Sequence, residues 1–138
     1  MRLCVLAIMC VFTFGASVPS NIAEQIAKTI FDENRHLHNR GQFHVSYVET
    51  IDFEGQDLIY IFHLNPKGFI MVPSDDRAVP NLAFGFEHSF DSNNMSYALS
   101  GLINQYKTEI LDLKNSQNEA SVEIKELWNS YYSGNIKT

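Results

Sequence analysis

The segment from Leu58 to Val72 places the strongest constraint on what this chain can fold into. Leu58 to Leu64 is apolar at nearly every position, which is typical of a central strand covered on both faces. Asn65-Pro66-Lys67-Gly68 follows, and this order favours a tight turn because proline fixes φ and glycine accepts a positive φ. Phe69 to Val72 is apolar again, so residues 58–72 are predicted to form an antiparallel hairpin.

Two further strands are predicted, one on each side of this hairpin in the sequence. Residues 43–47 alternate between apolar and polar side chains, which is the pattern of a half-buried strand. Residues 82–86 alternate between bulky and small side chains. The small residues, Ala83 and Gly85, allow another group to approach that face closely.

Helical periodicity marks both ends of the chain. Apolar residues at 22, 26 and 30 predict a first helix that begins at a capping box of Asn21 and Glu24. This helix is expected to fade over residues 35–39 and to stop at Gly41. A second apolar stripe over residues 99–113 follows a cap at Asn94 or Ser96. A third, over residues 124–131, follows a capping box of residues 116 and 119 and ends at 134. We therefore predict an α+β fold, a four-stranded antiparallel sheet with an N-terminal helix and two C-terminal helices packed on one face.

The first residues have the composition of a secretory signal peptide. Arg2 precedes an apolar run over residues 3–14, and small residues follow. This run is shorter than the roughly 20 residues that span a membrane. We expect a signal peptide over residues 1–20, cleaved after Ser20 in preference to Ser17. One domain, residues 21–138, would then be secreted or periplasmic.

Removal of the signal would leave a chain without cysteine, because Cys4 and Cys10 both lie in the apolar run. Such a chain excludes a thiol nucleophile, an internal disulfide and a Cys-ligated metal, and it favours bacterial export. The formal net charge of −6, or −7 once Arg2 is removed, argues against a nucleic-acid partner. The sequence also lacks a basic helix for a membrane surface. We expect no membrane insertion of the mature chain, and a monomer when it is free.

The sequence contains no arrangement typical of an enzyme or a metal site. His36 and His38 would point about 200° apart on a helix, so we interpret them as surface histidines. Asp75 and Asp76 have the composition of paired catalytic or Mg²⁺-binding carboxylates, but a turn carboxylate paired with the arginine that follows is commoner. His63, inside an apolar strand, is interpreted as a hydrogen-bonded core histidine. We predict no enzymatic activity, no cofactor and no metal ion.

Four sequence blocks follow one another between residues 58 and 113. They are Leu58-Ile-Tyr-Ile-Phe-His-Leu, Gly68-Phe-Ile-Met-Val-Pro-Ser-Asp-Asp-Arg, Val79-Pro-Asn-Leu-Ala-Phe-Gly-Phe and Ser89-Phe-Asp, and a helix with Tyr106 and Ile110 comes after them. Together they resemble the prodomain of streptopain-type cysteine proteases, and the block from Gly68 to Arg77 is the most specific. The chain departs from that pattern at Pro73, where a small residue is usual, and at Phe84 and Phe86.

The resemblance implies both a function and a site. A protease domain would follow a prodomain, whereas this sequence ends at Thr138, which is the form of the stand-alone Spi-type inhibitors. In the zymogens, the loop after the Phe-Asp pair reaches the active site, and an Asn helps to hold the catalytic His out of position. The equivalent protease-binding loop here is Phe90, Asp91, Ser92, Asn93, Asn94, Met95, Ser96 and Tyr97, with Asn93 or Asn94 as that asparagine. The family-motif residues with structural roles would be Gly68, Phe69, Val72, Asp75, Arg77 and Pro80.

The leading hypothesis is a secreted or periplasmic protein that blocks the cleft of a streptopain-like cysteine protease non-covalently. This task needs a rigid scaffold that presents a loop, and it needs no catalytic residue. The negative net charge would speed encounter with a basic protease surface. Two non-enzymatic alternatives are a folding chaperone for a cognate protease and a surface binding module on the same fold.

Overall fold

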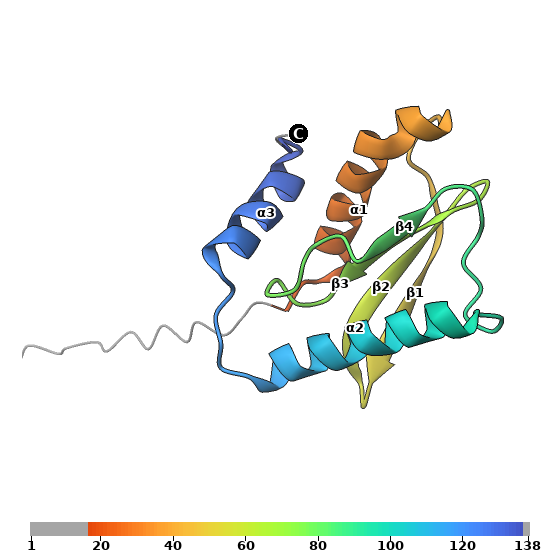
Figure 1. Ribbon diagram of the computed structural model, residues 1–138. Helices are drawn as coiled ribbons and strands as arrows, with labels where there is room; N and C mark the ends of the chain where they lie inside the picture. The colour runs from red at the N-terminus through yellow and green to blue at the C-terminus, as the bar shows by residue number, and fades with distance from the viewer. Residues whose placement is uncertain (1–16, 137–138) are drawn as a thin grey trace, which may run out of the picture.

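The computed structural model describes residues 17–136, which form one four-stranded antiparallel sheet and three α-helices (Figure 1). The strands are ordered β1-β2-β3-β4 across the sheet. In chain order the elements are α1 (Ser20–Asn34), the 3₁₀ helix η1 (Arg35–His38), β1 (Val45–Phe53), β2 (Gln56–Leu64), β3 (Phe69–Pro73), β4 (Ala83–Gly85), α2 (Tyr97–Asn115) and α3 (Val122–Ser133). The predicted α+β fold is confirmed.

Helices cover both faces of the sheet, so the prediction of a single covered face was wrong. Alternate residues of β2 enter two different cores: Phe62 packs with α1, while Ile61 packs with α2. Ile103 and Ile110 are the buried residues of α2. The order of elements suggested one face, but the unbroken apolar run of β2 requires cover on both. Figure 1 shows α1 and α2 on opposite sides of the strands.

The third helix completes the core on the α1 side. Trp128 of α3 is buried, and its indole Nε1 donates a 2.8 Å hydrogen bond to the carbonyl of Ala78. On α1, the Thr29 hydroxyl donates to the Tyr131 carbonyl at 2.8 Å. These contacts fix α3 to α1 and to the loop after β3.

Two of the predicted capping boxes do not form. α1 begins at Ser20 with Pro19 in the cap position and no side-chain cap bond, so Asn21 lies inside the helix. α3 begins after Ser121, whose hydroxyl accepts from a backbone N–H of the first turn, whereas Ser116 lies just past the end of α2. Each box has the expected residue types, but α1 begins one residue before its box and α3 begins at a different serine.

Other helix signals are confirmed. Ser96, one of the two predicted caps, accepts a 3.2 Å hydrogen bond from the backbone N–H of Leu99. Gly134 ends α3 in the left-handed conformation, with φ at 70°. The first helix fades where the sequence predicts: α1 ends at Asn34, and η1 ends at Asn39, whose φ is 51°, two residues before Gly41.

The first strand is longer than predicted and begins later. It starts at Val45 instead of residue 43 and pairs with β2 from Val45–Leu64 to Phe53–Gln56. Tyr47, Val48 and Phe53 are all exposed. The alternating pattern fades after Tyr47 because β1 is an edge strand whose side chains lie partly in solvent.

Most of the predicted signal peptide lies outside the described residues, so the signal and its cleavage stay a prediction. Residues 17–19 are described, and they contact the body of the fold. Within residues 17–136, no helix has the length and apolarity needed to cross a bilayer.

Glycines in the hairpin turn and in β4 allow close backbone contact. Gly68 has a φ of 111°, and a Cβ there would lie 2.8 Å from the carbonyl oxygen of Gly85. The turn contains a cis Asn65–Pro66 bond, and the hairpin predicted over residues 58–72 is confirmed as β2–β3. The aromatic ring of Phe69 packs against Gly85, and a Cβ added to Gly85 would lie 2.9 Å from Cε1 of Phe69. This is the close approach that the small residues of β4 predicted.

We expect Gly68→Ala to lower the free energy of unfolding by about 2–3 kcal/mol, because the new methyl group combines a strained φ with a backbone clash. Gly101→Ala is the matched control: nothing lies within 4 Å of a Cβ on that helical glycine. It should stabilise by about 0.5–1 kcal/mol through helix propensity. Urea unfolding measures both, and equal stability of the two variants would contradict this account of the turn.

Candidate functional site

The predicted binding loop lies in the connection between β4 and α2, and two apolar side chains fix it from inside. Phe90 is 5% exposed. Its ring centroid lies 5.5 Å from that of Phe69 and 6.0 Å from that of His63. Met95, near the other end, packs against the same core on the α2 side of the sheet. The segment between them is therefore held at both ends.

The beginning of this connection is held by an arginine from a distant part of the chain. Arg40 Nη1 donates to the carbonyl of Phe86 at 2.8 Å, and its Nη2 donates to the carbonyl of Lys67 at 2.7 Å. The guanidinium also lies 5.8 Å from the centre of the Phe86 ring. Nothing in the local sequence pattern signals this contact, because it joins segments more than twenty residues apart.

Ionic contacts at the surface reinforce the same end. The Glu87 carboxylate lies 3.1 Å from Nδ1 of His38 and 3.6 Å from Nζ of Lys67. The hydrogen bond from His38, with the positive charge of Lys67, lowers the pKa of Glu87. The carboxylate therefore stays ionised, and it joins η1 to the start of the connection.

The tip of the loop, residues 91–94, is a hydrogen-bonded turn that faces solvent. The Asp91 carboxylate accepts a 2.9 Å hydrogen bond from the backbone N–H of Asn93. The backbone carbonyl of Asp91 accepts a 3.2 Å hydrogen bond from the backbone N–H of Asn94. The side chains of Ser92, Asn93 and Asn94 are exposed. Tyr97, the first residue of α2, is 96% exposed. The turn therefore presents two amides and a hydroxyl beside a solvent-exposed aromatic ring.

A buried histidine lies under the anchor of the loop. His63 Nε2 is 3.0 Å from a carboxylate oxygen of Glu49, and the Tyr47 ring stacks on the imidazole with centroids 4.0 Å apart. His63 is thus a core histidine with a hydrogen-bond partner, as predicted. Tyr47 belongs to the strand predicted over residues 43–47, whereas Glu49 lies beyond it, and the sequence indicated neither contact with His63.

The family-motif residues support the fold in two separate places. Gly68 and Phe69 lie beside the loop, and Phe69 contacts its anchor Phe90. Val72 and Pro80 are buried. The remaining two, Asp75 and Arg77, lie apart from the loop and bind each other.

The Asp75–Arg77 pair joins three segments of the chain. The Asp75 carboxylate accepts from Arg77 Nη2 at 2.7 Å and from its Nε at 2.8 Å, and Arg77 Nη1 also donates to the carbonyls of Ser116 and Asn118. Burial disfavours the charged carboxylate, but the hydrogen bonds and charge of Arg77, helped by Lys114, outweigh it and lower the pKa of Asp75. This is the paired turn carboxylate predicted in preference to a catalytic pair.

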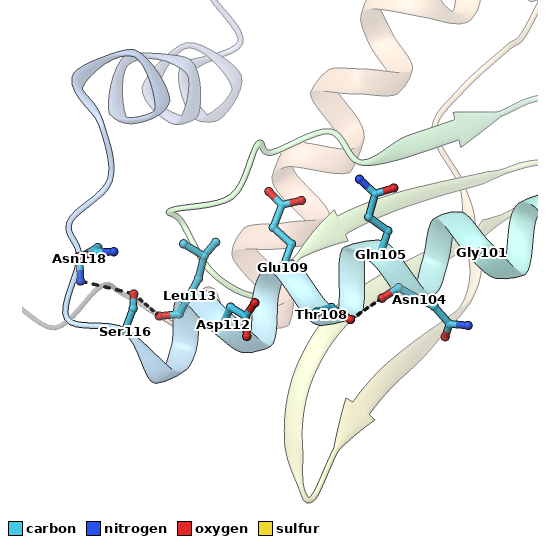
Figure 2. A pocket seen from close by; sticks show the side chains of 9 residues that line it. All are labelled: Gly101, Asn104, Gln105, Thr108, Glu109, Asp112, Leu113, Ser116 and Asn118. Carbon is cyan, nitrogen blue, oxygen red and sulfur yellow. Dashed lines mark hydrogen bonds between the residues drawn. The ribbon is translucent and has the colours of Figure 1, made fainter.

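A groove of about 820 Å³ runs along the outer side of α2, from Gly101 to the connection with α3 (Figure 2). Its described lining residues are Gly101, Asn104, Gln105, Thr108, Glu109, Asp112, Leu113, Ser116 and Asn118. Amides, hydroxyls and two carboxylates make up its polar groups, and no His or Cys is among them. Across residues 17–136, no cluster of three His, Cys, Asp or Glu residues could hold a metal ion.

Comparison with known families identifies what this scaffold is. A model of the Spi protease inhibitor family matches residues 15–110, which is more than half of the chain. The chain belongs to the Spi protease inhibitor family. Within this Spi-family protein, the match covers the whole sheet, the connection with its exposed tip and most of α2, whereas α3 lies beyond it. None of the curated proteins and none of the solved structures matches the chain.

Membership of the Spi family makes a protease the partner and favours a binding role over an enzymatic one. A protein inhibitor of a protease acts through a surface that the protease recognises. In this Spi-family protein, the exposed tip and Tyr97 lie inside the matched range.

Proposed function

We propose that this protein is exported and inhibits a streptopain-like cysteine protease by occupying its active-site cleft non-covalently. The observation that carries the proposal is the solvent-facing loop, residues 91–97, held at both ends within the part of the chain that matches the inhibitor family. The resemblance of residues 58–113 to a streptopain-type prodomain supports the choice of target.

Preorganisation of the loop favours tight binding. A loop that is already ordered loses little conformational entropy when it docks, so more of the contact energy appears as affinity. Phe90 and Met95 anchor the two ends, and Asp91 organises the turn between them. The amides of Asn93 and Asn94 offer hydrogen bonds to a cleft, and Tyr97 offers a large amphipathic ring.

Non-covalent blockade is consistent with the chain's composition. The two cysteines, Cys4 and Cys10, lie in the apolar run of the proposed signal peptide. The processed inhibitor would therefore have no thiol to form a mixed disulfide with a catalytic cysteine. Inhibition should be reversible on dilution and insensitive to prior alkylation of the inhibitor.

The test is an inhibition titration of the exported, processed protein against an active streptopain-like protease, with papain as the specificity control. We expect stoichiometric loss of the first activity and unchanged papain activity, because the loop is matched to one cleft. Several streptopain-like proteases left fully active at micromolar excess would overturn the proposal. An increased yield of refolded protease without inhibition would instead identify a folding chaperone.

A further inference from the structure

Residues 18 and 19, which we call the N-terminal strap, are an integral part of the fold. Ser17 forms an antiparallel bridge with Asp75, and the backbone N–H of Val18 donates to the carbonyl of Ser74 at 2.8 Å. The Val18 carbonyl accepts from the Tyr60 hydroxyl at 3.1 Å. The Val18 side chain is 4% exposed and belongs to the core under α1, whereas Ser17 is exposed.

The strap also begins the first helix. The carbonyl of Pro19 accepts from the backbone N–H groups of Ile22 and Ala23, both at 3.1 Å. A chain that started at Asn21 would lose this acceptor and the buried valine. It would also place a positive α-ammonium group at the N-terminal end of α1, where the helix dipole disfavours positive charge. The family match, which begins at residue 15, includes the strap.

We propose that the precursor is processed at the Ser17–Val18 peptide bond, so that Val18 becomes the first residue of the mature inhibitor. A signal peptidase requires small residues at the first and third positions before the bond, and Ser17 and Gly15 supply them after the apolar run. This proposal rests on export of the chain and is independent of which protease it inhibits.

The chemistry is hydrolysis by the host's signal peptidase. Water adds across the Ser17–Val18 bond, the signal fragment leaves with the Ser17 carboxylate, and Val18 gains an α-ammonium group. The Val18 nitrogen donates a 2.8 Å hydrogen bond to the Ser74 carbonyl in the uncleaved chain, and as an ammonium group it can still donate to that carbonyl. The cut therefore separates an exposed residue from a buried one and preserves the core.

The test is export of the full precursor from a bacterial host, followed by N-terminal sequencing and intact mass of the recovered protein. We expect a single start at Val18. A start at any other residue, or no processing, would overturn the assignment. Two variants at exposed positions sharpen it: Ser17→Leu should abolish processing, and the matched Ser20→Leu should leave it unchanged. The reverse pattern would place the cut after Ser20 and contradict the proposal.

A stability measurement tests the strap separately from the peptidase. Chains that begin at Val18 and at Asn21 are compared by thermal unfolding. We expect the shorter chain to melt about 10 °C lower, because it lacks the buried side chain, the two hydrogen bonds of Val18 and the first acceptor of α1. Equal melting temperatures would show that the strap contributes nothing, and that the fold gives no reason to retain Val18.

Discussion

Replacing Arg77 by methionine is expected to lower the free energy of unfolding by about 3–5 kcal/mol at neutral pH. The Asp75 carboxylate is buried and accepts from two side-chain nitrogens of Arg77, so the change leaves a charge without its ion-pair partner. It also removes the hydrogen bonds to the carbonyls of Ser116 and Asn118, which hold the connection between α2 and α3. Urea unfolding followed by circular dichroism measures the loss.

The loss is expected to shrink as the pH falls. Arg77 holds the folded-state pKa of Asp75 below its ordinary value, in spite of burial. In the wild type, the stability that this pair contributes is therefore fully present above the unfolded pKa, about 4, and is lost as the pH falls through the folded pKa. In Arg77→Met, burial dominates, and protonation of Asp75 removes the unpaired charge. The free energy of unfolding of the wild type and of Arg77→Met, measured at pH 7 and near pH 4, tests this expectation.

Removing both charges is the control for this prediction. The double variant Asp75→Asn with Arg77→Met should be more stable than Arg77→Met alone, because no charge is left buried without a partner. A pH-independent loss in Arg77→Met, with no recovery in the double variant, would show that Arg77 acts through its carbonyl contacts instead of its charge.

Each part of the fold that the sequence predicted has a cause that lies within a few neighbouring residues. The run from Leu58 to Leu64 is apolar at almost every position, and burial on both faces follows directly from that composition. The turn before Gly68 and the stripe on α2 are equally local. Ser96 and Gly134 could be identified because capping chemistry depends on neighbours within one turn of helix.

The parts that the sequence did not predict depend on contacts between distant segments. Asn21 and Glu24 have the pattern of a capping box, but burial of Val18 moves the start of α1 to Ser20. The second half of β1 has no clear alternation, and it becomes a strand because β2 supplies a full ladder of partners. Pairing of this kind overrides local propensity.

The candidate site shows the same division. Resemblance to a prodomain located residues 90–97, and the exposed tip could be anticipated from its polar composition. The contacts of Arg40 and His63 could not be predicted, because they join the connection to segments that are distant in the sequence. The sequence therefore indicated a candidate binding segment, whereas the contacts that hold it became evident only from the three-dimensional structure.

Tyr97→Ala is expected to weaken inhibition of a streptopain-like protease by about 30-fold or more, on the premise that the proposed function is correct. An interface tyrosine that acts as a hot spot contributes about 2 kcal/mol or more, which corresponds to this factor. At 96% exposure the ring contributes almost nothing to the free fold, so stability should change by less than about 0.5 kcal/mol. The inhibition constant from progress curves, set beside a melting curve, separates the two effects.

The matched control is Tyr132→Ala. Tyr132 is a half-exposed tyrosine on α3, beyond the residues that match the inhibitor family. Its removal should leave the inhibition constant within about twofold, because a rim or remote contact contributes little. A comparable loss for both variants would indicate a general effect on the fold or on solubility, and it would contradict a specific role for the loop.

Separate changes of Asn93 and Asn94 to alanine then identify which amide enters the cleft. The backbone N–H groups of both residues are used by Asp91, so alanine keeps the turn and removes only the exposed amide. The residue that bonds to the protease should lose about tenfold or more in affinity, since a buried partner group is left unpaired, while its neighbour changes little. If Tyr97 and both asparagines can be replaced without loss while the wild type inhibits, the protease must be bound by another surface, and the loop assignment fails although the function stands.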